Sequence, residues 1–522
     1  MSDSEQRRFH FWAVVAWLGG WTLFRLIYSS GFLLAPDETN YWQWGRHLAW
    51  GYHDQAPLLG WAIGISTQLF GHNETAVRLP SILSMGVASA YMCAMAWRWF
   101  SPRTAWAVAL LSQGVLEFNV GGLLATCDGL QAAAWAGACY HAARAYEDDR
   151  WSQWLGAGLW FGTGMLAKYT MVLFAPSVFA YGLFSAVHRK RLAGAKPYVA
   201  LGLGSALFFP VIWWNFQNGF QSFRHVAYIG GANTGFSLHI KYLGDLFGSQ
   251  AALLSPLVFI LILAAWVAAM RGRYRPGHWI VPFAVWTSFP MLGLFLALSL
   301  HTRIYGNWPG AAYLTATVLA AAFYAPAASG PGSELPRPRP RLWKWALGTS
   351  YAFTLLILVQ TVFPVLPLPV AWDRTATELS GWDKLGEAAS EMALDMPRPD
   401  KTFLFGMRYQ VASELAFYAP GNPETVSINR WNRPNVYDYW FTDEALLGMD
   451  AVGAVTRHAD MYFKRLGEIF DRVDPPVELP IRERRPLWGT EKTVNTFWLI
   501  RCYGFKGGIH WQPPKGFDVR KG

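Results

Sequence analysis

Long apolar runs separated by short polar loops dominate the first two-thirds of the chain. Runs long enough to cross a hydrocarbon core of roughly 30 Å begin near residues 10, 77, 104, 125, 154, 171, 198, 249, 279, 308 and 344. This pattern predicts a polytopic α-helical membrane protein with about eleven transmembrane helices. The two runs on either side of Ala167–Thr170 are short, which leaves the count open by one.

The pattern changes after residue 366. Residues 367–522 contain alternating stretches such as KTFLFGM and TFWLIRCY, the turn-forming sequence PGNP and many charges. Alternation of apolar and polar residues is typical of strands that are buried on one face. We therefore predict a transmembrane domain over residues 1–366 and a small mixed α/β domain over residues 367–522.

Composition and charge agree with a membrane protein. Hydrophobic residues make up 53% of the 522 residues and charged residues 15%, against roughly 25% charged residues in soluble domains. The net charge of +10 comes mostly from cations in alternate short loops, all on the predicted inner side, such as His188–Arg191 and the Pro/Arg-rich stretch 326–341. This is the positive-inside bias, so it indicates topology rather than a nucleic-acid partner. With Arg7 and Arg8 inside, an odd number of spans places the C-terminal domain outside.

Several kinds of site have no support in the sequence. The chain has no CxxC, GxGxxG, P-loop, HExxH or GxSxG motif, so neither a zinc site nor nucleotide-dependent chemistry is indicated. His47, His53 and His72 share one loop, but their spacing does not form a helical metal pair. We predict no metal site and no cofactor, and leave a requirement for a divalent metal open.

The predicted topology brings distant ionisable groups to the outer face. They are Asp37, Glu38 and Asp54 in the first outer loop, Asp128 at the start of the fourth span, Lys168 in a tight turn, and Arg303 in the last outer loop. Ionisable groups at membrane depth are costly and are functional candidates. Acidic groups beside basic ones suit a reaction in which a hydroxyl attacks and an anion leaves.

Each candidate also has a structural interpretation. Asp37 and Asp128 could cap helices, Lys168 could extend its ammonium to the membrane surface, and Arg303 could contact an anionic lipid. Arg25, inside the first span, is predicted to pair with a carboxylate. For the whole chain, a transporter or flippase of lipid-linked sugar and a non-catalytic partner in envelope assembly remain alternatives. A transporter favours charges near the bilayer midplane, whereas these candidates gather at one face.

Four segments of the transmembrane part resemble a known family. They are PDETNYWQWGRHLAWGYHDQAPLLGW (Pro36 to Trp61), ETAVRLPSIL (Glu74 to Leu83), GMLAKYTMVLFAP (Gly164 to Pro176) and YGNWPGAAYL (Tyr305 to Leu314). They are similar to glycosyltransferase family 39, the protein mannosyltransferase superfamily of GT-C fold, in its bacterial branch related to lipid A aminoarabinose transferases. The tail segments RYQVASELAFYAPGNP (Arg408 to Pro423) and RPNVYDYW (Arg433 to Trp440) resemble the tails of uncharacterised members.

The resemblance implies a function and a role for each candidate. The donor would be a polyprenyl-phosphate-linked sugar, and the acceptor a hydroxyl of lipid A, another envelope glycan or a protein. The reaction would take place at the periplasmic face of the bacterial inner membrane, in contact with membrane lipids. Asp37 matches the catalytic base and Glu38 its neighbour, which helps to position the acceptor. Asp128 matches a second acidic position, and Lys168 and Arg303 fall where cations would hold the lipid phosphate.

The sequence departs from the family at one point. Relatives often have an acidic residue, Lys or His, and then two prolines, where this chain has Asp54-Gln55-Ala56-Pro57. A cation is therefore missing next to Asp54, and the resemblance leaves His53 or Lys168 as the substitute that would contact the phosphate.

Overall fold

The computed structural model describes residues 2–232, 237–274, 278–326, 339–484 and 491–512. The chain forms two compact units. The helical unit comprises Met1–Tyr28, Gln55–Leu59 and Arg78–Leu356, and the mixed unit comprises Ser29–Asp54, Gly60–Val77 and Ile357–Gly522. Most of the Pro/Arg-rich stretch 326–341, namely residues 327–338, lies outside the described residues.

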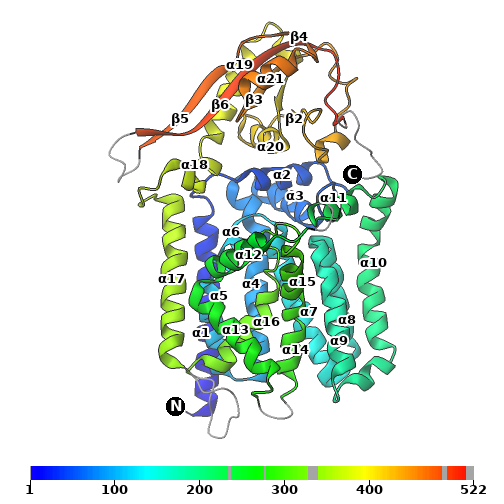
Figure 1. Ribbon diagram of the computed structural model, residues 1–522, viewed down its shortest axis with the longest axis vertical. Helices are drawn as coiled ribbons and strands as arrows, with labels where there is room; N and C mark the ends of the chain where they lie inside the picture. Colours follow the sequence, from blue (N-terminus) through cyan, green and yellow to red (C-terminus); the bar gives the residue numbers. More distant parts are fainter. Residues whose placement is uncertain (1, 233–236, 275–277, 327–338, 485–490, 513–522) are drawn as a thin grey trace. The chain divides into compact units, whose positions relative to one another are not determined.

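The helical unit is built from long helices that run side by side (Figure 1). Its α-helices are α1 (Asp3–Tyr28), α4 (Glu74–Trp99), α5 (Pro102–Gly114), α6 (Leu116–Leu123), α7 (Cys127–Asp148), α8 (Trp151–Ala167), α9 (Phe174–Phe184), α10 (Lys196–Gln217), α11 (Gln221–Ile229), α12 (Ile240–Leu254), α13 (Pro256–Met270), α14 (Ile280–Trp286), α15 (Phe289–Ser299), α16 (Ala312–Tyr324) and α17 (Pro340–Val362). Two 3₁₀ helices join them, η1 (Tyr169–Leu173) and η2 (Arg189–Ala193).

The prediction of eleven spans is not confirmed, although a multi-pass helical membrane protein is. Within the described residues five helical segments are long and apolar enough to cross a membrane, and the bent pair α12–α13 makes a sixth. That pair turns by 107° at Ser255, whose φ is +66°. The run predicted from residue 104 is likewise divided, because Val115 is extended between α5 and α6. A run of apolar residues predicts that a segment is shielded from water, but it does not predict whether the helix there is continuous.

Small residues let α8 pack closely against α10, as is common between membrane helices. A Cβ atom at Gly158 of α8 would lie only 2.3 Å from the carbonyl oxygen of Ala200 in α10. The same helix meets α7, where a Cβ atom at Gly137 would lie 2.7 Å from the ring of Trp160. This packing fixes the C-terminal end of α8, after which Lys168 follows.

The buried cation of the first helix is paired differently from the prediction. The guanidinium of Arg25 is 1% exposed and donates through Nη2 to Oε1 of Gln113, at 2.8 Å, and to Oδ1 of Asn119, at 2.9 Å. The predicted carboxylate partner is therefore wrong, since two neutral carboxamides accept these hydrogen bonds.

The mixed unit contains a sheet with helices, as predicted for the C-terminal part. Its α-helices are α2 (Pro36–Arg46), α3 (Leu58–Phe70), α18 (Arg374–Glu378), α19 (Trp382–Leu394), α20 (Tyr409–Tyr418) and α21 (Ala459–Leu466); its 3₁₀ helices are η3 (Val370–Trp372), η4 (Pro399–Lys401) and η5 (Val436–Tyr439). Its strands are β1 (Thr402–Gly406), β2 (Thr425–Ser427), β3 (Asp450–Val455), β4 (Phe470–Val473), β5 (Val477–Arg484) and β6 (Glu491–Phe505).

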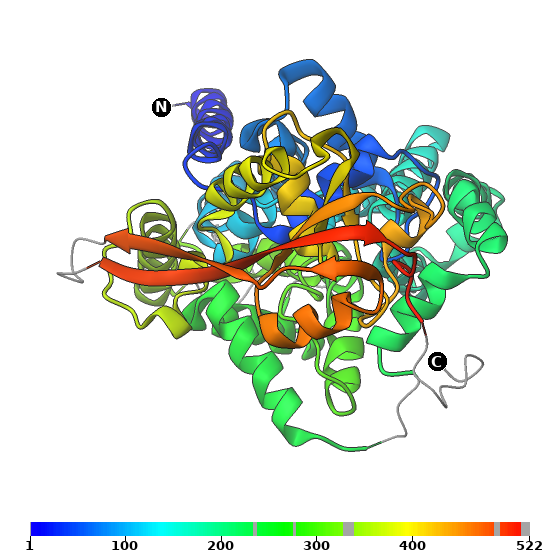
Figure 2. The same ribbon diagram turned by 90° about the horizontal axis from the view of Figure 1, so that it is seen from above.

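The six-stranded sheet has the order β2-β1-β3-β6-β4, and β5 also pairs with β6. Strands β2, β1 and β3 are parallel, whereas β6 runs antiparallel to β3, β4 and β5. The long β6 crosses the unit with β5 beside it (Figure 2). The stretches KTFLFGM and TFWLIRCY lie on β1 and β6, so the alternation of apolar residues indicated both strands correctly.

The first predicted outer loop belongs to the same unit as the sheet. Helix α2 packs against α20, and the ring of Trp44 stacks on that of Tyr52 at 4.3 Å between centroids. At the end of α2, Arg46 forms an ion pair of 2.6 Å with Glu424. These contacts attach the loop that carries Asp37 to the C-terminal part of the chain.

Candidate functional site

Asp37 lies in the first turn of α2, where the local sequence fixes its position. Pro36 occupies the first helical position, for which its φ is suited, and Asp37 follows. Glu38 is 1% exposed, and its carboxylate accepts a hydrogen bond of 2.9 Å from the backbone N–H of Ala35. Glu38 therefore stabilises the start of the helix, while the side chain of Asp37 remains accessible to solvent.

Two side chains from the C-terminal part of the mixed unit surround the Asp37 carboxyl. The hydroxyl of Tyr409 donates to Oδ1 of Asp37 over 3.4 Å. The guanidinium of Arg433 lies over the Tyr409 ring, 5.1 Å from its centroid. Nη1 of Arg433 donates to Oδ1 of Asp54 over 2.9 Å. A chain of contacts thus connects the two carboxylates that the sequence placed in one loop.

The surroundings of Asp37 raise the pKa of its carboxyl above the usual value. Although the side chain reaches solvent, protein surrounds the carboxyl on most sides, and this partial loss of hydration has the largest effect. The negative charge of Asp54 acts in the same direction. The hydrogen bond from Tyr409 and the positive charge of Arg433 oppose both effects without cancelling them. A carboxylate with a raised pKa is a stronger base than an ordinary aspartate, which is the property that proton abstraction near neutral pH requires.

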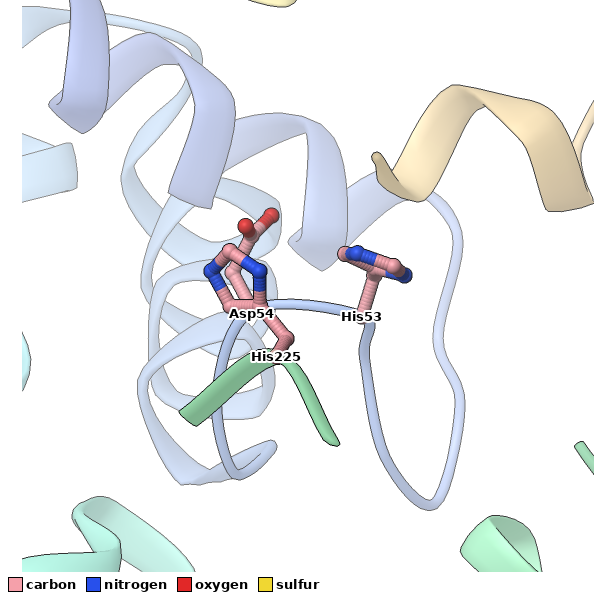
Figure 3. A group of neighbouring side chains, drawn as sticks. All are labelled: His53, Asp54 and His225. Atoms are coloured by element: carbon pink, nitrogen blue, oxygen red, sulfur yellow. The ribbon is translucent and has the colours of Figure 1, made fainter. Parts of the chain in front are cut away.

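His53 and Asp54 follow each other in the loop before α3 (Figure 3). The imidazole of His53 is 2% exposed, and its Nδ1 lies 3.3 Å from the hydroxyl of Tyr439. Burial lowers the pKa of His53, and the charge of Asp54 only partly opposes this. The ring is therefore neutral near pH 7, so His53 can donate or accept a hydrogen bond but does not supply the missing cation.

Arg433 is the cation beside Asp54. The charge absent from Asp54-Gln55-Ala56-Pro57 is supplied here by a residue 379 positions further along the chain. The side chain of Arg433 is 44% exposed, whereas that of Asp54 is 17% exposed. Asp54 thus binds one side of the Arg433 guanidinium, and the rest of that group remains accessible to a ligand.

The other histidines of the loop have partners of their own. His47 lies against Glu424, with 3.1 Å between Nε2 and Oε2. His72 accepts a hydrogen bond of 2.9 Å from Nε1 of Trp42. The two rings thus support α2 and the loop around it.

A second polar cluster lies in the helical unit. Asp128 is in the first turn of α7, and Lys168 is the extended residue between α8 and η1. Nζ of Lys168 donates to Oδ1 of Asp128 over 2.6 Å, and Nδ2 of Asn307 donates to Oδ2 over 2.8 Å. The side chains of Lys168 and Asp128 are 8% and 20% exposed. The acidic and the cationic candidate of this unit, Asp128 and Lys168, thus form a direct ion pair.

Glu117 of α6 was not singled out by the sequence. It is 8% exposed, and it lines a small cavity together with Asp128, Gln131 and Gly310. Gly310 packs closely against this side chain, because a Cβ atom at position 310 would lie 2.5 Å from Oε1 of Glu117. Glu117 lies within an apolar run, and its place among hydrophobic residues was the signal that could have identified it.

Arg303 is not part of that cluster. It lies in the loop between α15 and α16 with an exposed side chain, and makes no ion pair within the part of the chain that the structure describes. Its predicted role as a phosphate ligand is therefore supported by accessibility alone.

Comparisons with known proteins show which proteins the chain is similar to. The family described as dolichyl-phosphate-mannose-protein mannosyltransferase matches residues 54–214. The lipid A galacturonosyltransferase RgtD of Rhizobium johnstonii is 25% identical over 314 residues, which are 58% of this chain and 63% of that protein. The chain thus spans somewhat less than two-thirds of this relative.

The fold agrees with that of a solved transferase. ArnT from Cupriavidus metallidurans in the apo state superposes with a TM-score of 0.61 at 14% sequence identity, over 94% of this chain and 97% of ArnT. ArnT bound to undecaprenyl phosphate gives a TM-score of 0.59 at 15% identity, with the same coverage. These similarities confirm the predicted GT-C fold.

Proposed function

We propose that this chain, a GT-C protein related to glycosyltransferases that modify lipid A, transfers a glycosyl group from a polyprenyl-phosphate-linked sugar to an acceptor hydroxyl. ArnT has been solved with undecaprenyl phosphate, and RgtD acts on lipid A. For this chain we propose the same class of donor, and lipid A, another envelope glycan or a protein as acceptor. The site of action would be the periplasmic face of the bacterial inner membrane.

The reaction would be a single displacement with inversion. The acceptor oxygen attacks the anomeric carbon, the bond from that carbon to the phosphate oxygen breaks, and the lipid phosphate leaves. Asp37 takes the acceptor proton as general base. The single observation that carries this assignment is the solvent-accessible Asp37 carboxyl, with a raised pKa and a hydrogen bond from Tyr409.

The leaving phosphate needs positive charge, because negative charge accumulates on it as the bond breaks. Lys168 donates to Asp128, whose other carboxylate oxygen accepts a hydrogen bond from Asn307, so the ammonium is oriented before substrate binds. Arg303, whose side chain is exposed, would add a second cation. This scheme needs no metal ion, and we propose that the transfer proceeds without one.

Three residues would position other groups for the reaction, namely Glu38, Asp54 and His53. Glu38 fixes the start of α2 and with it the direction of Asp37. Asp54 holds Arg433. His53, being neutral, offers a hydrogen bond to a substrate hydroxyl.

The test uses purified full-length protein in detergent, a radiolabelled polyprenyl-phosphate sugar and lipid A. The Asp37→Asn variant should lose transfer by at least about 100-fold, since general-base catalysis contributes roughly 10²–10⁴-fold. The matched control is Asp383→Asn, because Asp383 is exposed and occupies the same second position of α19 that Asp37 occupies in α2. Transfer by Asp37→Asn equal to that of the control would exclude Asp37 as the base.

A further inference from the structure

A polar cavity of about 270 Å³ lies inside the mixed unit. Residues that line it include Arg408, Tyr409, Asn429, Asn432, Arg433 and Asn435. Arg408 and Tyr409 are at the start of α20, and the other four belong to the segment between β2 and η5. The cavity is smaller than most small-molecule sites, which measure roughly 300–1,000 Å³, and its volume suits a single sugar rather than a prenyl chain.

One buried amide in the cavity wall lacks a partner. Asn429 is 1% exposed, and its Oδ1 accepts hydrogen bonds of 2.7 Å from Oγ of Ser427 and from Nδ2 of Asn435. These two donors fix the orientation of the amide. Nδ2 of Asn429 then has no hydrogen-bond partner among the described residues. Buried donors in folded proteins are nearly always paired, so this atom indicates a ligand with an acceptor oxygen.

The charge of the cavity wall is positive. Arg408 is exposed and immediately precedes α20, so its side chain and the positive end of the helix dipole lie together. Arg433 contributes the part of its guanidinium that Asp54 does not hold. None of the described residues that line the cavity is a carboxylate. Two guanidinium groups in one cavity wall, one of them only partly neutralised by Asp54, are suited to bind phosphate or carboxylate.

We propose that this cavity binds a sugar that carries an oxyanion, either a phosphate or a carboxylate. Arg408 and Arg433 pair with the oxyanion, and Nδ2 of Asn429 donates to a sugar oxygen. The proposal rests on the proposed transferase function and deepens it, because it assigns an anionic rather than a neutral sugar to one of the substrates. Tyr409 lines the cavity and also bonds to Asp37, so a sugar bound there adjoins the proposed base.

The test is equilibrium binding to the full-length protein in detergent, by calorimetry at millimolar ligand. The probes are glucose 1-phosphate, glucuronate and glucose. We expect at least one anionic probe to bind at least about tenfold more tightly than glucose, because charge-assisted hydrogen bonds are roughly twice as strong as neutral ones. Preference for glucose 1-phosphate would assign a phosphorylated sugar, and preference for glucuronate a uronic acid.

Four variants locate the binding. Arg408→Gln and Asn429→Asp should each weaken binding of the anionic probe by at least about tenfold. The first removes a charge-assisted hydrogen bond, and the second adds a repulsive charge. Arg482→Gln is the matched control, since Arg482 is an exposed arginine on β5 and does not line the cavity. Asn429→Ala, checked for an unchanged unfolding temperature, separates loss of the amide from misfolding.

The outcomes are distinct from those of the transfer assay. Equal affinity for glucose and both anionic probes, no binding of any probe, or unchanged binding by Arg408→Gln would overturn the cavity assignment. Asp37→Asn should bind the anionic probe normally while transfer is lost. If Asp37→Asn instead transferred normally and still bound the probe, the assignment of the base would fail and the cavity assignment would stand.

Discussion

Substitutions in the ion pair between Lys168 and Asp128 distinguish most sharply between a role of Lys168 in stability and a role in sugar transfer. In Lys168→Met, the Asp128 carboxylate loses its cation at 2.6 Å and keeps only the neutral amide of Asn307 at 2.8 Å. Breaking a fully buried ion pair costs about 3–5 kcal/mol. Since the Asp128 side chain is 20% exposed, we expect a smaller loss, about 2–3 kcal/mol of unfolding free energy.

The double variant Lys168→Met/Asp128→Asn contains no unpaired charge, and the amide oxygen introduced at position 128 can still accept a hydrogen bond from Asn307. It should therefore be more stable than the sum of the single variants by about 1–3 kcal/mol, the usual size of a direct coupling. The assay is denaturant unfolding in mixed micelles, run in parallel with sugar transfer. Because Lys168 is proposed to bind the leaving phosphate, the double variant should regain stability and remain inactive.

Two results would refute this reasoning. Additive losses of stability would show that the pair is not energetically coupled. Recovery of both stability and transfer in the double variant would show that Lys168 acts only as the structural partner of Asp128.

Three further predictions concern Asp37 and its neighbours. The rate of transfer should fall as pH decreases through the raised pKa of Asp37. The Tyr409→Phe substitution removes a hydrogen bond that lowers this pKa, so the acidic limb of the pH–rate profile should move to higher pH in that variant. In Asp54→Asn the same limb should move to lower pH, because the repulsive charge that raises the pKa is removed; no movement in either variant would contradict the assignment of that limb to Asp37. Glu38→Ala should lower the unfolding free energy by about 1–2 kcal/mol, since the backbone N–H of Ala35 loses its acceptor; calorimetric unfolding measures this, and an unchanged value would exclude the capping role.

The proximity of Asp128 and Lys168 follows from the predicted topology, although their ion pair was not predicted. Asp128 and Lys168 were expected on one face because alternate loops of a membrane bundle lie on the same side, and the structure joins them by an ion pair. Asn307, the third member, stands in the quoted segment YGNWPGAAYL and was not singled out. A carboxamide carries no charge, so neither the cost of burial nor the topology argument distinguishes it from other loop residues.

The surroundings of Asp37 could not be predicted in the same way. Tyr409 and Arg433 come from the C-terminal part of the chain, more than 370 residues away. Both belong to segments that resemble relatives, yet such resemblance does not reveal contacts between distant segments. The missing cation beside Asp54 was noticed in the sequence, but its replacement by Arg433 required the fold.

The central claim is that this chain transfers a sugar and that Asp37 is the base. The raised pKa of Asp37 means that the native state holds this proton more tightly than the unfolded chain, so its stabilisation falls as pH rises through that pKa. Asp37→Asn should therefore be no less stable than the wild type at pH 7, and loss of function would not reflect unfolding.

The most direct measurement is mass spectrometry of envelope lipids, glycans and proteins from cells that contain the wild-type protein, Asp37→Asn or neither. The account predicts a sugar-sized mass increase on one acceptor only with the wild type, and accumulation of polyprenyl-phosphate sugar with the variant. Three identical samples, with the variant expressed and the donor lipid present, would contradict transferase activity and would favour transport or a role in envelope assembly.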